Sequence, residues 1–418
     1  MVVDADGLEL LARAAFARRE DPARALGAAA GDVARACEAM AERFRRGGKL
    51  LAFGNGGPST DAQHVSVEFV HPVIVGKRAL PALSLVTDTA TVMGVARRAG
   101  LDEVFAHQLD VLGDGDDIAL GISSDGRCEN VLRALAAAKR RGLLTVALLG
   151  GDGGPIAASD AVDHVLVVPS DDPQIVKEVH VTAYHVLWEL VHVFLDRPDG
   201  VATDAGDLGG LYPFLYGGTG DADLRSDVAR STAEKVDEIV RLRGVVGDAM
   251  ATGLAACARD LRARFAGGGK LLTFGNGGSS SDAQEVAQSF LEPGRTDMPP
   301  LPALCLTNDI AVLTALSNDV DFDVVFARQL RAFGKPDDAV IGLSTSGNSP
   351  NLIGAFDAAR RLGLLTIGFA GSDGGAMAAA DTVDHLFVVP SSSVHRIQEV
   401  QTTLYHVLRE LTAAATAA

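Results

Sequence analysis

The stretch GNGGSSSDAQ at residues 275–284 repeats the stretch GNGGPSTDAQ at residues 54–63 with an offset of 221 residues. The same offset holds further along the chain, where YHVL at residues 184–187 recurs at residues 405–408. No insertion or deletion is needed between the first match and the last. Because chance similarity does not keep one register over such a length, the sequence predicts two copies of one domain in tandem.

The repeat predicts a first domain over residues 1–196 and a second over 226–418, joined by a linker over 197–225 that is rich in Gly and Asp. The linker contains the apolar run LYPFLY at residues 211–216. This run is too apolar for a free tether. We expect it either to dock on one domain or to form a lid over a site.

The composition describes an acidic globular chain. Of its 418 residues, 47% are hydrophobic, and 37 Lys and Arg stand against 54 Asp and Glu, which gives a net charge of −17. This apolar content can build sizeable cores without disulfides or a structural metal. The negative charge, without any basic block, argues against a surface for nucleic acid or anionic membrane. Backbone N–H groups and hydroxyls can still hold a phosphate locally.

The cysteines and the N-terminus carry no targeting or cross-linking signal. The four cysteines are far apart, which argues against a disulfide framework or a zinc knuckle; they are Cys37, Cys128, Cys257 and Cys305. The first residues, MVVDAD, lack the basic and apolar segments of a signal peptide. No apolar run approaches the ~20 residues of a membrane helix. We therefore expect a cytoplasmic protein.

Each copy alternates helical and strand patterns. In the first copy we expect helices over 30–46, 59–70, 129–141, 154–159 and 173–195, and strands over 49–53, 83–86, 118–122, 145–149 and 164–168. The strands are short, continuous and rich in Val, Leu and Ile, as in a parallel sheet that is buried on both faces. The sequence thus predicts two doubly wound α-β-α sandwiches with flavodoxin-like parallel sheets, in which ligands bind at the carboxyl ends of the strands.

Two strand-to-helix turns in the second copy are suited to an anion. They are the glycine-rich turn at 275–281 and the turn LSTSGNS at 343–349. Glycines let the backbone approach a ligand, hydroxyls donate hydrogen bonds, and the following helix directs its N-terminus at the ligand. Simple N-capping by serine is the structural alternative.

The same turns are altered in the first copy. Pro58 replaces Ser279, which removes a hydroxyl and an N–H group. Asp125 stands where Ser346 stands, and a carboxylate there repels phosphate. We expect this turn to be impaired, with Arg127 partly offsetting the charge of Asp125.

The first copy retains a pair of chemically active side chains. His64 and Glu68 are four residues apart on one predicted helix and therefore share a face. Their counterparts in the second copy are Glu285 and Ser289. The last helix carries an equivalent histidine in both copies, His185 and His406. An imidazole and a carboxylate on facing helices can move protons or bind a metal, although such side chains on a helix are often only solvated or hydrogen-bonded.

These residues resemble the sugar isomerase (SIS) domain family, and within it the phosphoheptose isomerases. The motifs that carry the resemblance are GNGGSSSDAQ from Gly275, LSTSGNSPN from Leu343 and RIQEVQTTLYHVL from Arg396, with GNGGPSTDAQHVSVE and KEVHVTAYHVL in the first copy. The resemblance covers nearly all of both copies and excludes the linker. It implies two tandem SIS domains.

The resemblance also implies roles for individual residues. Catalytic roles fall on Glu68, His185 and His406. Substrate- and phosphate-binding roles fall on Asn276, Gly277, Gly278, Ser279, Ser344, Thr345, Ser346, Ser349, Asp309 and Gln398, and in the first copy on Asn55, Asp88, Ser123 and Ser124.

Some members of the family are similar in binding zinc through four positions. In the first copy these read His64, Glu68, Lys177 and His185, with Lys177 where the family has Gln. The second copy also lacks a full set, with Glu285 and Ser289 at the first two positions. The expected reaction requires no cofactor. The metal expectation is therefore limited to zinc at His64, Glu68 and His185.

The resemblance implies an aldose–ketose isomerase that acts on a sugar phosphate. The substrate it favours is sedoheptulose 7-phosphate, converted to D-glycero-D-manno-heptose 7-phosphate through a cis-enediolate. Family members are tetramers with active sites at subunit interfaces. We therefore expect a homodimer of tandem chains, a pseudo-tetramer, with a composite inter-domain site that joins the intact second-copy turns to Glu68. Two alternatives stay open. One is a non-catalytic module that binds a partner protein such as the replication initiator, and the other is a sugar-phosphate sensor.

Overall fold

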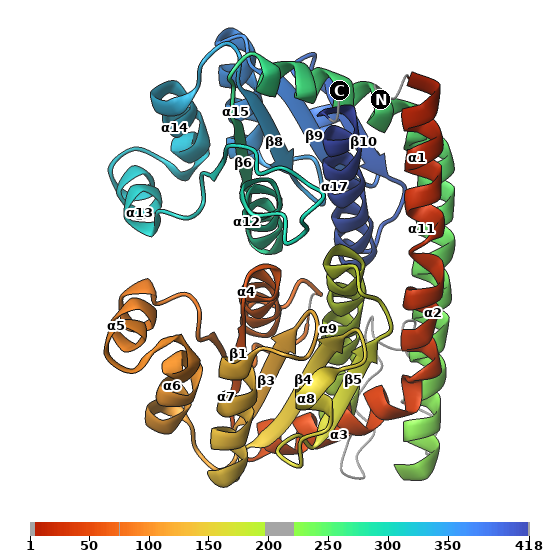
Figure 1. Cartoon of the computed structure of the whole chain (residues 1–418), viewed down its shortest axis with the longest axis vertical. Helices are drawn as coiled ribbons and strands as arrows, with labels where there is room; N and C mark the ends of the chain where they lie inside the picture. The colour runs from red at the N-terminus through yellow and green to blue at the C-terminus, as the bar shows by residue number, and fades with distance from the viewer. Residues whose placement is uncertain (1–4, 75, 197–220, 417–418) are drawn as a thin grey trace. The chain divides into compact units, whose positions relative to one another are not determined.

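The computed structural model describes residues 5–74, 76–196 and 221–416. The chain forms two compact units, which we name the N-terminal unit (Asp21–Val240) and the C-terminal unit (Met1–Glu20 with Arg241–Ala418). In the described part of the chain, each unit contains one five-stranded sheet whose paired strands are all parallel (Figure 1). The prediction of two α/β domains is therefore confirmed.

The N-terminal unit matches the predicted elements closely. Its strands are β1 (Leu50–Gly54), β2 (Ala82–Ser84), β3 (Ile118–Ser123), β4 (Leu144–Gly150) and β5 (His164–Val168). Its helices are α2 (Glu20–Ala28, which begins at the unit boundary), α3 (Ala30–Arg45), α4 (Gly57–Val70), α5 (Thr89–Ala99), α6 (Val104–Leu112), α7 (Glu129–Arg140), α8 (Gly154–Ala157) and α9 (Pro173–Leu195), with a 3₁₀ turn η1 (Leu101–Glu103). The strand order β2-β1-β3-β4-β5 is the flavodoxin-like order.

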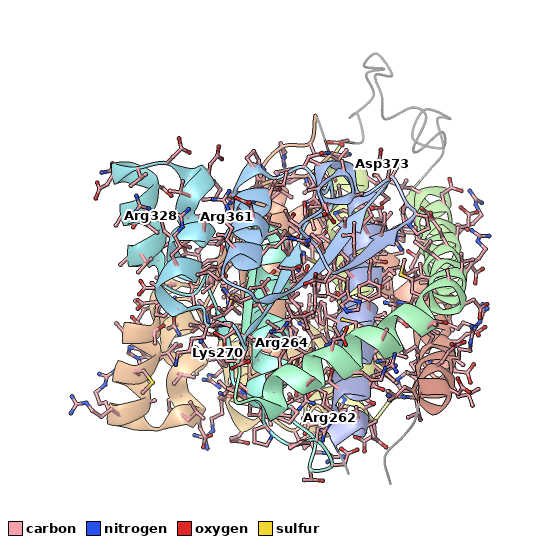
Figure 2. All side chains as sticks on the ribbon, turned by 90° about the horizontal axis from the view of Figure 1, so that it is seen from above. Arg262, Arg264, Lys270, Arg328, Arg361 and Asp373 are labelled. Carbon is pink, nitrogen blue, oxygen red and sulfur yellow. The ribbon has the colours of Figure 1, made fainter. Side chains whose placement is uncertain are left out.

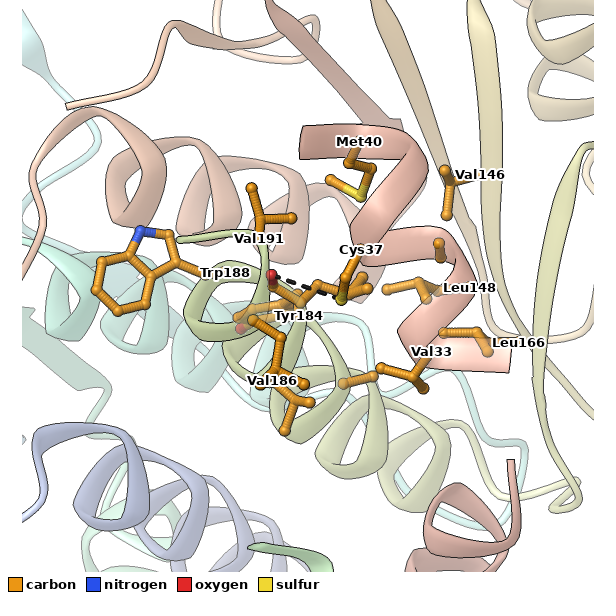
Figure 3. Close-up of a cluster of buried hydrophobic side chains, with 14 of the residues drawn as sticks. Val33, Cys37, Met40, Val146, Leu148, Leu166, Tyr184, Val186, Trp188 and Val191 are labelled. Atoms are coloured by element: carbon orange, nitrogen blue, oxygen red, sulfur yellow. Dashed lines mark hydrogen bonds between the residues drawn. The ribbon is translucent and has the colours of Figure 1, made fainter. Parts of the chain in front are cut away.

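Helices cover both faces of this sheet, because successive strand side chains point to opposite faces. Leu51 and Phe53 pack among the residues of α5, α6 and α7. Leu50 and Ala52 pack among those of α3, α4 and α9. Figure 3 shows part of this second core, where Cys37 of α3 lies between the sheet and α9, with its Sγ 3.9 Å from the carbonyl oxygen of Leu187.

The C-terminal unit repeats the plan. Its strands are β6 (Leu271–Gly275), β7 (Ala303–Cys305), β8 (Ala339–Leu343), β9 (Leu365–Gly371) and β10 (His385–Val389), in the order β10-β9-β8-β6-β7. Its helices are α1 (Ala5–Ala17), α12 (Gly278–Leu291), α13 (Ile310–Asp319), α14 (Val325–Phe333), α15 (Pro350–Arg361), α16 (Gly375–Ala379) and α17 (Val394–Thr416), with a 3₁₀ turn η3 (Phe322–Val324). Read from β7 to β10, the order is the same flavodoxin-like one.

Charged side chains fix the amino ends of these strands, at the edge of the sheet opposite the expected site. The Nζ of Lys270 lies 2.6 Å from Oδ2 of the buried Asp338, and Arg264 donates to the carbonyl of Gly363 at 3.2 Å (Figure 2). Lys49 and Asp117 form the same 2.6 Å contact in the N-terminal unit. The repeat therefore preserves structural contacts as well as sequence.

Helices α1 and α11 do not follow the division of the chain into two sequence repeats. Helix α1 belongs to the C-terminal unit, where Arg19 pairs with Glu410 at 2.8 Å. A Cβ atom added at Gly247 would lie 2.7 Å from the ring of Phe16, so glycine permits this close packing. The long helix α11 (Asp221–Ala266) begins in the N-terminal unit, where Lys235 pairs with Glu189 at 2.8 Å.

The compact units divide the chain at Glu20/Asp21 and Val240/Arg241. The domain limits of 1–196 and 226–418 follow the repeat instead, and they stay a prediction. Of the predicted linker, residues 197–220, with the apolar run at 211–216, lie outside the described residues, and residues 221–225 begin α11. Among the helices that the structure describes, none has the length and apolar character needed to cross a membrane.

Candidate functional site

The two predicted anion-binding turns of the C-terminal unit follow β6 and β8. These neighbouring strands lie at the switch point of the sheet, where ligands bind in such folds. The amides of Asn276 and Asn351 join the two turns through a reciprocal pair of hydrogen bonds, each 2.9 Å long. The turns that the sequence singles out are therefore held together as one surface.

The turn at residues 344–349 has its backbone fixed by hydrogen bonds and exposes one of its hydroxyls. Ser344 Oγ accepts a hydrogen bond from the N–H of Gly347 at 3.0 Å, and Ser346 Oγ accepts one from the N–H of Asn348 at 3.2 Å. Gly347 has a φ of 67°, and a Cβ there would lie 2.1 Å from the carbonyl oxygen of Gly374. Ser346 is exposed, and Ser349 precedes α15 without a side-chain capping bond among the described residues. The N-terminus of α15 is thus available to an anion.

The turn at residues 275–281 leads directly into α12. A Cβ at Gly275 would lie 2.3 Å from the carbonyl oxygen of Ser279, and Gly277 has a φ of 56°. Both positions therefore require glycine. The side chain of Ser279 is 4% exposed, so it lies within the turn rather than at its rim.

The altered turn of the N-terminal unit keeps the same backbone shape but carries its own negative charge. Ser123 Oγ accepts from the N–H of Gly126 at 3.0 Å, as Ser344 does from Gly347. Asp125 Oδ1 accepts from the N–H of Arg127 at 2.9 Å, where Ser346 Oγ accepts from Asn348. A carboxylate therefore takes the place of the exposed hydroxyl, as the sequence predicts.

The guanidinium of Arg127, which we expect to offset the charge of Asp125 in part, contacts a different carboxylate. Its guanidinium makes a double contact with Asp152, at 2.8 and 2.9 Å, and only its backbone N–H contacts Asp125. A hydrogen bond from the N–H of Gly154 and the charge of Arg127 hold the pKa of Asp152 below its usual value. Both contacts come from the same guanidinium nitrogen.

The N-terminal unit brings together three buried side chains that were predicted from different parts of the sequence. His64 Nε2 lies 3.6 Å from Glu68 Oε1. The ring of His185, from α9, meets that of His64 edge-on at a centroid distance of 5.4 Å. Each of the three residues can offer one ligand atom, and these atoms lie within 4.8 Å of one another. Two imidazoles and a carboxylate are a donor set that suits zinc.

Lys177, at the fourth position of the predicted zinc set, points to other partners. Its Nζ lies 2.6 Å from Asp61 Oδ1 and 2.9 Å from Thr60 Oγ1, both near the start of α4. Lys177 and Asp61 are both buried. An ammonium that is bound to a carboxylate offers no lone pair to a metal.

The C-terminal unit contains a second carboxylate–imidazole pair. Glu285 of α12 and His406 of α17 lie with Oε1 and Nε2 3.6 Å apart, and their side chains are 5% and 0% exposed. The ring of Tyr405 meets that of His406 edge-on at 4.7 Å. His406 is a candidate from the sequence, whereas Glu285 is recognised there only as the counterpart of His64. The sequence signal that could have indicated this pair is the acidic side chain of Glu285 at the position equivalent to His64.

Comparison with known proteins places this architecture in a family. A model of the SIS domain matches residues 22–150 and 236–371, more than half of the chain. The chain belongs to the SIS domain family.

Individual relatives match one SIS domain's length of this chain. The phosphoheptose isomerase of Desulfovibrio desulfuricans is 48% identical over 173 residues, which are 41% of this chain and 81% of that protein. The phosphoheptose isomerase of Solidesulfovibrio magneticus is 43% identical over 188 residues, which are 45% of this chain and 91% of that protein.

One solved structure resembles both SIS domains together. The C-terminal domain of glucosamine-fructose-6-phosphate aminotransferase from Francisella tularensis covers 94% of this chain and 94% of its own, with a TM-score of 0.56 and 10% identity. At this identity the likeness concerns the fold alone. The tandem arrangement of SIS domains is therefore shared with another protein.

Other predicted site residues have structural partners inside their SIS domains. Asp88 and Asp309 are exposed N-caps: Asp88 accepts from the N–H of Thr91 at 3.0 Å, and Asp309 from that of Ala311 at 3.0 Å. The hydrogen bonds from Thr91 lower the pKa of Asp88. Asn55 pairs with Asn130 across the switch point, as Asn276 does with Asn351.

Proposed function

We propose that this SIS-domain chain is a sugar-phosphate isomerase that interconverts an aldose and a ketose. The turn at 344–349 carries the proposal, because it presents the exposed hydroxyl of Ser346, the half-buried hydroxyl of Ser349 and a helix N-terminus at the switch point of an SIS domain. The relatives named phosphoheptose isomerase support a seven-carbon substrate. The substrate we propose is sedoheptulose 7-phosphate, converted to D-glycero-D-manno-heptose 7-phosphate in the cytoplasm.

The proposed chemistry needs a base, a proton carrier and a phosphate anchor. A carboxylate removes the proton from the carbon beside the carbonyl, which gives a cis-enediolate, and returns it to the neighbouring carbon. An imidazole moves protons between the two oxygens. The phosphate, held by Ser344, Ser346 and Ser349, orients the reacting end of the sugar.

The proposal includes a composite active site to which two domains contribute residues. Glu68 and a histidine of one domain would serve a phosphate that a neighbouring domain holds in its 344–349 turn. A homodimer of tandem chains would supply such neighbours.

Zinc is a further part of the proposal. His64, Glu68 and His185 would hold the ion, as their converging donor atoms suggest. A zinc ion bound there would polarise a carbonyl oxygen. Lys177 would remain outside the ligand set, since its ammonium is bound to Asp61.

The test uses the purified full chain with heptose, hexose and pentose phosphates. Thermal-shift measurements report binding, and an aldose–ketose assay reports turnover. Turnover of a sugar phosphate is the expected result. The substitution Glu68→Gln should then abolish turnover and leave binding nearly unchanged. Binding without turnover indicates a sensor, and neither binding nor turnover indicates a protein-interaction module.

A further inference from the structure

The buried pair of Glu285 and His406 lies in the same unit as the intact phosphate turns. Helix α12 starts within the first turn and carries Glu285 seven residues after Gly278. At 1.5 Å per residue, this places the carboxylate roughly 10 Å along the helix from the turn. Helix α12 therefore connects the first turn to Glu285, and the neighbouring helix α17 carries His406.

Helix α17 connects the imidazole to the second turn. The side-chain amide of Gln401 donates to the carbonyl of Ser344 at 3.1 Å, and His406 follows five residues later on the same helix. Helices α12 and α17 pack against each other within the unit (Figure 1). One unit thus contains the hydroxyl-bearing turns, a carboxylate and an imidazole.

The second carboxylate is displaced from the position of the first. Glu285 is equivalent to His64, and Ser289 is equivalent to Glu68. Ser289 cannot replace a carboxylate as a base, and its hydroxyl donates to the carbonyl of Val286 at 2.9 Å within α12. The carboxylate is therefore placed four residues, about 6 Å along the helix, closer to the phosphate turn.

We infer that Glu285 is a second proton-transferring carboxylate, with His406 as its partner, and that the C-terminal unit holds a phosphate anchor and an acid–base pair by itself. This inference rests on the proposed isomerase function, and it gives the phosphate at the 344–349 turn a base from its own unit, as an alternative to the composite arrangement with Glu68. Glu285 takes the proton from the carbon beside the carbonyl, and the electron pair of the broken C–H bond forms the C=C bond of the enediolate. His406 gives a proton to the carbonyl oxygen and takes one from the neighbouring hydroxyl. Glu285 then returns its proton to the adjacent carbon, so the step is balanced without a co-reactant.

The first experiment compares Glu285→Gln with Glu68→Gln and with the exposed control Glu292→Gln, all in the full chain. Sedoheptulose 7-phosphate is the probe, with turnover and calorimetric binding measured on each variant. We expect Glu285→Gln to lower kcat by about 100-fold or more, with binding unchanged within about threefold. Glu292→Gln should match the wild type, because Glu292 follows α12 on the surface.

The outcomes separate this inference from the proposed function. Wild-type kcat in Glu285→Gln, together with loss of kcat in Glu68→Gln, overturns the inference and leaves the isomerase function standing. A wild-type chain that turns over no sugar phosphate overturns both. If Glu285→Gln does not fold, Glu285→Asp provides the test. Aspartate keeps the negative charge, but its shorter side chain places the carboxylate further from the substrate. A lowered kcat at unchanged affinity then supports the inference, and a normal kcat overturns it.

Discussion

The ammonium of Lys177 lies 2.6 Å from the carboxylate of Asp61, and both side chains are buried inside the N-terminal unit. Lys177 comes from α9 and Asp61 from the first turns of α4, so the pair joins two helices that cover one face of the sheet. Removing one partner would leave an uncompensated charge in the interior.

Lys177→Met should therefore destabilise the N-terminal unit by about 3–5 kcal/mol. Denaturant unfolding of the full chain, followed by the fluorescence of the single tryptophan, Trp188, reports this unit. The matched control is Lys139→Met, since Lys139 is partly exposed in its pair with Asp163 and should cost less than about 1 kcal/mol. Equal stability of the two variants would contradict the prediction.

Replacing Asp125 should restore anion binding to the altered turn. Asp125→Ser puts back the hydroxyl that Ser346 supplies in the other unit and removes a charge that repels phosphate. We expect affinity of the N-terminal unit for phosphate to rise by at least about tenfold, which corresponds to about 1.4 kcal/mol. Calorimetry with inorganic phosphate should then detect a second site per chain. An unchanged stoichiometry would contradict the prediction and leave Pro58, in the neighbouring glycine-rich turn, as the change that prevents binding.

Ser346→Ala should weaken substrate affinity more than turnover. Its exposed hydroxyl lies at the turn that we propose holds the phosphate, which is remote from the reacting carbons. We expect KM to rise about tenfold with kcat within about threefold, because a uniform binding contact contributes equally to ground and transition states. Ser317→Ala, on the exposed surface of α13, is the control. A loss confined to kcat would place Ser346 in the chemistry instead.

Metal binding by the N-terminal unit is testable without turnover. Zinc competition against a chromophoric chelator should show one site per chain, and His64→Asn should weaken it by about 100-fold. The variant His107→Asn, on α6, should bind like the wild type. Equal zinc affinity in all three proteins would remove His64 from the ligand set.

The N-terminal unit should be sensitive to acid through His180. Burial lowers the pKa of this histidine to about 4. An unfolded histidine titrates near 6.5, so between about pH 6.5 and 4 the unfolded chain binds a proton that the folded chain does not. The free energy of unfolding is therefore not reduced by His180 above about pH 6.5. It decreases as the pH is lowered, by about 3 kcal/mol at pH 4. Unfolding titrations of His180→Leu should show a smaller decline than those of the wild type or of His71→Gln, which changes an exposed histidine.

The sequence predicted the buried elements better than the exposed ones. Helix α9 was predicted over 173–195, as observed, because Asp172 and Pro173 mark its start and apolar residues fill its length. Helices α5, α6, α13 and α14 were not predicted, although α6 and α14 each contain five buried residues. Val95 is the one buried residue of α5, and α13 has none, so hydrophobic periodicity gives little signal there.

The candidate site divides in the same way. The phosphate turns could be predicted because glycines and hydroxyls at strand ends form a local pattern. The pairing of Glu285 with His406 could not, because it depends on the rotation of two helices that are distant in the sequence. The alignment of the repeats did not indicate this pair, because Glu285 aligns with His64 and not with the carboxylate of Glu68. Only side-chain positions reveal that a displaced carboxylate meets the same imidazole.

The placement of α1 has a consequence for how the protein is made. This helix is translated before the N-terminal unit, yet Gly247, against which its Phe16 packs, is translated only after that unit. The apolar face of α1 therefore stays exposed to solvent until the N-terminal unit has been synthesised and the C-terminal unit begins to fold. Two fragments produced by cutting the gene between the repeats would not fold independently, because the C-terminal fragment would lack α1.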